Sequence, residues 1–317
     1  MGPALFIWLA FSIYRQIMHQ PHLEDSWLSI RSSLQSAEVL YLIGALLLVP
    51  VNWGLEAWKW KASVSSIHSL GFRDAFKAVL SGVSISVTMP NRVGEYLGRM
   101  MYLPEGNRLR AISVTLVGSL AQLLITVLAG TIGLMVLKNV WLDNFPGVRI
   151  WYRFLVYGLM VAGGVLALVY FNVSGTTGLF RRWFRAQRYL YLVEALQHFN
   201  NRLLWRIVFL SALRYLVFLL QYVLVFYLFD VHVPVLTIMA VTSVVFLAMA
   251  VIPSITLVEV GLRGEISIRL MGLFSANTLG IGFASITVWF INLILPAIMG
   301  SILILGLKIF RRKAGEE

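Results

Sequence analysis

The sequence carries GEYLGR at residues 94–99 and GEISIR at residues 264–269. Both strings read Gly-Glu-x-x-x-Arg, and each follows a proline, Pro90 or Pro253, that closes an apolar stretch. Ionisable residues at membrane depth are rare and costly, and they often mark substrate or ion paths. Hydrophobic segments interrupted by Pro and Gly at corresponding places in two halves are the best sequence indication of a transporter's binding site. The repeated string therefore favours a membrane transporter built from two related halves.

The composition is that of an integral membrane protein. Of the 317 residues, 59% are hydrophobic and 13% are charged, whereas a soluble domain has roughly 25% charged residues. The apolar runs at 203–229 and 283–307 are as long as spanning helices, which need about 20 residues. The net charge of +12 is typical of basic cytoplasmic loops beside spans, so we expect no nucleic-acid binding. The absence of cysteine excludes disulfides, thiolate metal sites and a cysteine nucleophile.

The pattern predicts an all-α polytopic membrane protein with about six spanning helices and two re-entrant hairpins. The predicted spans are 38–57, 111–137, 151–171, 207–229 and 281–307, and a shorter apolar segment at 3–14 is left open. The connections at 59–77 and 172–206 and the C-terminal tail are rich in Lys and Arg, which places them in the cytoplasm. The segments 78–103 and 235–278 must then enter and return from opposite faces. Two short spans in either place would give the same parity, so that alternative stays open.

These crossings predict an inverted repeat within a single integral membrane domain, residues 1–317. Each half supplies three crossings and one hairpin, and an odd number of crossings inverts the second half relative to the first. The first repeat covers about 1–148 with the hairpin 78–103, and the second covers about 149–308 with the hairpin 235–278.

Acids and arginines gather around the starts of the two motif helices. Glu95 and Arg99 are four residues apart, as are Glu265 and Arg269, so each pair shares a helix face. Helix N-termini favour anions, and the planar fork of arginine suits phosphate oxygens. The candidate substrate-binding residues are Arg92, Glu95, Arg99, Arg214, Glu259, Arg263, Glu265 and Arg269. The candidate hinge or turn residues are Pro90, Gly94, Pro253, Gly261 and Gly264.

A purely structural interpretation of these charges stays open. The ion pairs would then only hold the hairpins together, and Arg214 would extend its side chain to the membrane interface. Asn52, Gln122, Gln221 and Asn292 are predicted to hydrogen-bond between helices. The histidines fall in loops or at span ends, and the sequence has no nucleophile, P-loop or metal motif. We therefore predict no catalytic residue, no metal and no cofactor.

The stretch TMPNRVGEYLGR at residues 88–99 resembles the Pro-x-Arg-x-Gly-Glu-x-x-Arg signature of the lysylphosphatidylglycerol synthase/flippase transmembrane family, with the arginine here four residues after the glutamate. The stretch from Pro253 to Gly264 resembles that family's second motif with a longer spacing, and Trp58-Lys59-Trp60 is similar to an Arg/Lys-Trp step found there. The resemblance implies a domain that translocates lipids with modified phosphate head groups. Some members carry a following aminoacyl-transferase domain. Because this sequence ends at Glu317, we expect the stand-alone form, without that domain and without enzyme activity.

Together these features predict a flippase-like lipid translocase of the bacterial inner membrane, multi-pass, with a cytoplasmic C-terminus. It would move phospholipids or other phosphate-bearing lipids through a Glu/Arg-lined cavity between the two hairpins. The expected partners are membrane lipids with anionic or aminoacylated head groups, and homo-oligomer formation is left open. The alternatives are an ion- or proton-coupled transporter of a small soluble anion, a membrane-embedded lipid-phosphate transferase, and a non-transporting assembly subunit.

Overall fold

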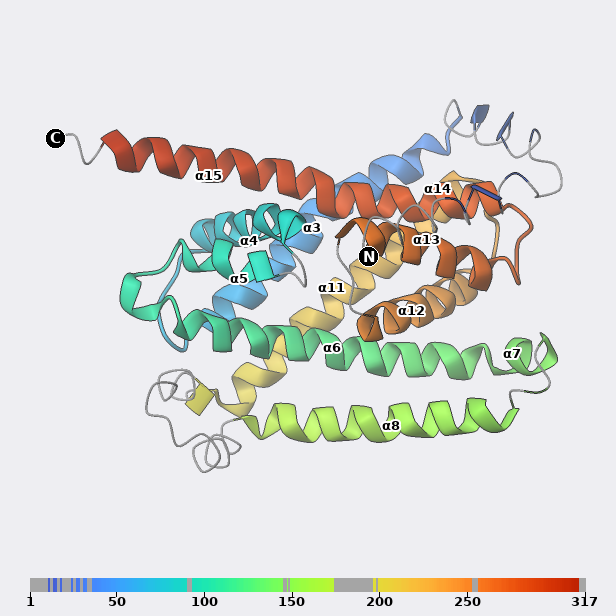
Figure 1. The fold of residues 1–317 in the computed structure, drawn as a ribbon, viewed down its shortest axis with the longest axis horizontal. Helices are drawn as coiled ribbons and strands as arrows, with labels where there is room; N and C mark the ends of the chain where they lie inside the picture. The colour runs from blue at the N-terminus through green and yellow to red at the C-terminus, as the bar shows by residue number, and fades with distance from the viewer. Residues whose placement is uncertain are drawn as a thin grey trace. The chain divides into compact units, whose positions relative to one another are not determined.

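The computed structural model describes residues 36–89, 93–144, 149–173, 199–252 and 256–313, with single positions at 147, 196 and 197 and between 11 and 32. All regular structure in this part of the chain is helical (Figure 1). The helices are α3 (Val39–Val64), α4 (Phe72–Thr88), α5 (Val93–Met100), η2 (Glu105–Asn107), α6 (Arg110–Val136), α7 (Lys138–Asn144), α8 (Arg149–Phe171), α11 (Asn201–Leu228), α12 (Val235–Val251), α13 (Thr256–Met271), α14 (Thr278–Trp289), the π-helical turn η5 (Phe290–Ile294) and α15 (Leu295–Lys313).

Five helices are long and apolar enough to cross a membrane: α3, α6, α8, α11 and the continuous stretch Thr278–Gly306. The shortest of them, α8, has 23 residues and is about 35 Å long, which exceeds a hydrocarbon core of about 30 Å. These helices cover the five predicted long spans, so the all-α polytopic class is confirmed. The predicted short segment 3–14 lies almost entirely outside the described residues.

The predicted loop at 59–77 is wrong at both ends, because α3 continues to Val64 and α4 begins at Phe72. Lys59 consequently lies in the helix and is buried. Its ammonium group is 2.6 Å from the carboxylate of Glu56, three residues earlier. An ion pair of this kind lowers the cost of burying a charge. The loop was predicted by counting Lys and Arg residues, and such a count does not take ion pairs into account.

The chain divides into two compact units. One contains residues 51–125, 164–214 and 293–317 and is called here the α4–α5 unit; the other contains 1–50, 126–163 and 215–292 and is called the α12–α13 unit. Each unit contains one of the two predicted hairpins and a part of each of the five long helices. The prediction of an inverted repeat within a single domain is not tested by this division and stays a prediction.

In the α4–α5 unit, glycines bring helix backbones into direct contact. Gly94 and Gly98 lie one turn apart on α5, and a Cβ at either position would collide with the backbone of α4, at Ile85–Ser86 and at Gly82 respectively. Small residues permit this close approach between helices in membranes. The C-terminal α15 packs against the same helix, since a Cβ at Gly300 would meet the Leu80 carbonyl. The pair α4–α5 is therefore tightly packed.

In the α12–α13 unit, α12 is buried along much of its length. It packs against α6, where a Cβ on Gly133 would come within 2.6 Å of the Ala240 carbonyl oxygen. Asn277 caps α14 by accepting a hydrogen bond from the Gly280 amide at 2.8 Å. Its amide nitrogen donates to the Phe229 carbonyl at 3.0 Å, which joins the α13–α14 turn to the end of α11.

The two hairpins consist of short helices. The 8 residues of α5 extend only about 12 Å, far less than the hydrocarbon core. The helices α12 and α13 have 17 and 16 residues. Gly94, Gly261 and Gly264 lie inside α5 or α13, while the connections between paired helices fall at residues 89–92 and 252–255.

Candidate functional site: two buried Glu/Arg clusters

The first cluster surrounds Glu56, which α3 places at 4% exposure. One carboxylate oxygen lies 2.9 Å from Nη2 of Arg99 on α5. The other lies 2.6 Å from Nζ of Lys59 and 3.2 Å from Nη1 of Arg214 on α11. Three helices of the α4–α5 unit therefore converge on one buried carboxylate.

Arg99 connects this carboxylate to the GEYLGR motif. Its Nη2 is also 3.4 Å from the Glu95 carboxylate, which confirms the predicted pairing at four residues' separation. The Arg99 residue is only 5% exposed, and its buried Nε has no hydrogen-bond partner within the described part of the chain. A buried donor without an acceptor costs free energy. Among the described residues, the Arg99 Nε–H is such a donor.

Arg214 is held by two further residues of α3. Its Nε donates to Oδ1 of Asn52 at 2.9 Å, and its guanidinium lies 5.4 Å from the centre of the Trp53 ring. These contacts place the Arg214 side chain in the cluster. It does not extend to the membrane interface, as the structural interpretation expected. The predicted interhelical role of Asn52 is confirmed by the same hydrogen bond.

Positive charge exceeds negative charge among the five ionic residues of this cluster. Glu56 and Glu95 supply two negative charges, whereas Lys59, Arg99 and Arg214 supply three positive charges. Unbalanced charge in a low-dielectric interior is costly. An anion that entered would balance it, and arginine forks bind phosphate oxygens particularly well.

The second cluster lies in the α12–α13 unit and centres on Arg263 of α13. Its Nη2 is 2.7 Å from the Glu259 carboxylate, and both side chains are largely buried. Its Nη1 donates to the Tyr222 hydroxyl on α11 at 3.3 Å. The guanidinium also lies 5.5 Å from the centre of the Phe246 ring on α12, so Arg263 contacts two helices besides its own, as Glu56 does.

The second copy of the repeated motif forms a different arrangement. Arg269 Nε is 2.6 Å from the Glu265 carboxylate, but the Arg269 side chain is 67% exposed while that of Glu265 is 8% exposed. Residues 263 and 265 are separated by about 200° around a helix, so this pair does not share a face with Arg263. The two Gly-Glu-x-x-x-Arg strings are therefore alike in sequence but not in environment.

Three of the predicted site residues cannot be placed, and the structure adds site residues that were not predicted. Pro90, Arg92 and Pro253 lie outside the described residues. The sequence analysis missed Glu56, although an acid inside an apolar span is itself an indication of a site. It named Lys59 within the Trp58-Lys59-Trp60 step but not as a site residue, and it missed Tyr222 and Phe246, for which the sequence alone offers no specific signal.

The predicted interhelical amides form a separate buried network in the α12–α13 unit. Asn292, in the π-helical turn, donates to Oε1 of Gln221 at 3.0 Å. Gln221 donates in turn to the Ala45 carbonyl at 3.0 Å. The prediction is therefore confirmed for both amides. Within the described ranges, no group of three or more His, Asp and Glu side chains could hold a metal ion.

The chain is helical and polytopic, and charged side chains from several helices form buried clusters. These features define a membrane protein with polar sites among its helices. The particular family follows from the sequence: a family model described as "Lysylphosphatidylglycerol synthase TM region" matches residues 23–300, and the chain belongs to that family. The resemblance found in the sequence is thereby confirmed. No curated protein matches the chain.

Proposed function

We propose that this protein is a lipid translocase that moves phospholipids, or other phosphate-bearing lipids, across the bacterial inner membrane. The family's description names a phospholipid that carries an amino acid on its head group. That description supports a lipid substrate with a phosphate and, in some cases, an added amine. The proposed activity is transport without covalent chemistry.

The observation that carries this proposal is the cation excess around Glu56. Among the described residues of this buried cluster, three cations face two carboxylates; this ratio favours an anionic ligand, and a phosphodiester has one negative charge. The partly exposed Glu95 carboxylate, beside Arg99, supplies an acceptor for a cationic head group such as an amino acid ester. The cluster thus offers groups for both parts of an aminoacylated phospholipid.

We further propose that the hairpins α4–α5 and α12–α13 are re-entrant and that the C-terminus is cytoplasmic. The short length of α5 supports this, because about 12 Å of helix does not cross the membrane. Non-spanning backbone at membrane depth is tolerated where it is packed in protein or lines a wet cavity. The close backbone packing of α5 on α4 meets the first of these conditions.

The test is lipid flipping in proteoliposomes with head-group-labelled phosphatidylglycerol, lysylphosphatidylglycerol and phosphatidylcholine. We expect the wild type to flip at least one phosphate lipid selectively, and Arg99→Met to abolish this. Arg108→Ala is the matched control, since Arg108 pairs at the surface with Glu105, whose side chain is 88% exposed. It should flip lipids at the wild-type rate.

Flux of a soluble anion by the same vesicles distinguishes the main alternative. Selective lipid flipping without sulfate or phosphate flux supports the translocase. Anion flux without flipping, or normal flipping by a folded Arg99→Met variant, contradicts the proposal.

A further inference from the structure

A recess lies where α6, α7 and α8 join, entirely within the α12–α13 unit. Its volume is about 720 Å³. Its walls come from the last turn of α6, from α7 and from the first three turns of α8 (Figure 1). Its lining includes the charged residues Lys138, Asp143, Arg149 and Arg153 and the apolar residues Val156 and Met160.

The walls of this recess are held in place by specific contacts. The Tyr152 hydroxyl is buried and donates to the Leu134 carbonyl at 2.9 Å, which ties the start of α8 to the end of α6. Further along, a Cβ on Gly163 would be 3.5 Å from the Val127 side chain, so the same two helices stay in contact. The helical hydrogen bond from the Trp141 amide to the Leu137 carbonyl, at 3.1 Å, carries the chain directly from α6 into α7.

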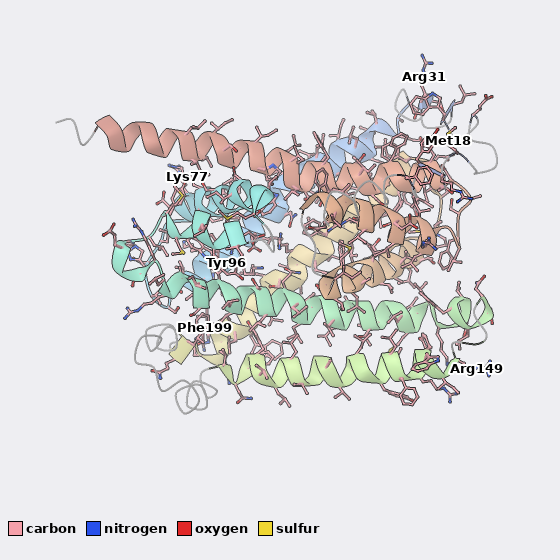
Figure 2. The ribbon with its side chains drawn as sticks, viewed as in Figure 1. Met18, Arg31, Lys77, Tyr96, Arg149 and Phe199 are labelled. Atoms are coloured by element: carbon pink, nitrogen blue, oxygen red, sulfur yellow. The ribbon has the colours of Figure 1, made fainter. Side chains whose placement is uncertain are left out.

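The charge of the recess is positive. Lys138, Arg149 and Arg153 supply three cations, and Asp143 is the one acid among the lining residues. Arg149 and Arg153 are four residues apart and therefore share a face of α8. Arg149 is labelled at the beginning of that helix in Figure 2. Two of the three cations therefore lie on one face at the start of α8.

Polarity falls along α8 from this end toward the middle of the span. The lining residues of α8 are first arginine and tyrosine, then Val156 and Tyr157, and finally Met160. The outer surface at the same end carries Trp151, which is 74% exposed, and Phe154. Exposed aromatic side chains near span ends are typical of the membrane–water interface. The recess therefore combines an anion-binding end at the interface with an apolar end toward the hydrocarbon.

We propose that this recess binds an anionic phospholipid, with its phosphate at Lys138, Arg149 and Arg153 and its acyl chains along Val156, Tyr157 and Met160. Lysine and arginine near a membrane surface attract anionic lipids, and a free phosphate would leave the apolar half of the recess without a partner. The recess shares no lining residue with the Glu56 and Arg263 clusters, so the proposal does not depend on transport.

The test measures binding of phosphatidylglycerol, phosphatidylcholine and glycerol phosphate to the purified full chain in detergent, by native mass spectrometry or microscale thermophoresis. Two interfacial cations contribute about 1 kcal/mol each, so Arg149→Ala/Arg153→Ala should weaken phosphatidylglycerol binding about 30-fold. Met160→Gln should weaken lipid binding without changing that of glycerol phosphate. Arg108→Ala/Arg202→Ala, which removes the same net charge from a half-exposed and an exposed position outside the recess, should bind like the wild type.

The proposal is supported if phosphatidylglycerol binds more tightly than phosphatidylcholine and only the recess variants lose this preference. Equal binding of the two lipids overturns it, as does an equal loss in the charge-matched control. Glycerol phosphate binding as tightly as the lipid would show a soluble-anion site instead. Because flipping is not measured, a negative result here leaves the translocase proposal standing, and the reverse is also true.

Discussion

Removing Glu56 should destabilise this protein more than removing Arg99, although the two residues form one ion pair at 2.9 Å. Without Arg99, the Glu56 carboxylate keeps Lys59 at 2.6 Å and Arg214 at 3.2 Å. Without Glu56, Lys59 and Arg214 lose this carboxylate, and Arg99 keeps the more distant Glu95 carboxylate at 3.4 Å. Counted over the five ionic residues, Arg99→Met makes the cluster neutral, whereas Glu56→Gln raises its net charge from +1 to +2. This difference is the reason for the unequal effects.

The expected magnitudes come from this geometry. Breaking a buried ion pair so that a charge is left uncompensated costs about 3–5 kcal/mol, which is the cost expected for Glu56→Gln. For Arg99→Met the remaining cations keep the carboxylate paired, so we expect about 1.5–3 kcal/mol, the value of one hydrogen bond to a charged group. Residues in one network are not additive, and the double variant should fall short of the sum by about 1–3 kcal/mol.

The measurement is equilibrium unfolding in mixed micelles, followed by tryptophan fluorescence. The chain has 10 tryptophans, and Trp53 contacts Arg214 within the cluster. Arg108→Ala serves as the control and should unfold like the wild type. The reasoning is refuted if Arg99→Met is the more destabilising single substitution, or if the two single effects add to within about 0.5 kcal/mol.

Two further predictions concern the helix packing and the second cluster. Gly98→Ala should separate α5 from α4, because the new Cβ meets the Gly82 backbone, whereas Gly106→Ala has open space around it; the thermal midpoint in detergent should fall by several degrees only for the first. Arg263→Met should reduce stability by about 3 kcal/mol or more, while Arg269→Ala, at an exposed position, should change it by less than about 0.5 kcal/mol. Equal effects of the two arginine substitutions would show that the repeated motif, and not burial, determines the role of each residue.

The five long spans could be predicted from the sequence because hydropathy over about 20 residues is a local property. The pairing of Glu95 with Arg99 and of Glu265 with Arg269 could be predicted for the same reason, since residues four apart share a helix face. The end of α3 could not be predicted this way, because the burial of Lys59 depends on Glu56 and on helices packed from elsewhere in the chain.

The unequal environments of the two repeated strings also depend on helix packing. Arg99 and Arg269 occupy the same place in their strings, yet the side chain of one is 6% and that of the other 67% exposed. No local pattern distinguishes them, because exposure depends on which side of each helix its neighbours cover. The same holds for Arg263, which contacts Tyr222 and Phe246 from two other helices.

The sequence by itself determined that this is a helical membrane protein of the lysylphosphatidylglycerol synthase TM family, with acids and arginines concentrated in two short helical segments. Only the tertiary structure decided which carboxylate compensates which cation. Arg214 meets Asn52, 162 residues away in the chain, and Arg99 meets Glu56, 43 residues away. The physical reason is that a buried charge is stabilised by whatever lies within a few ångströms of it, and those neighbours are brought together by packing between helices, not by spacing along the sequence.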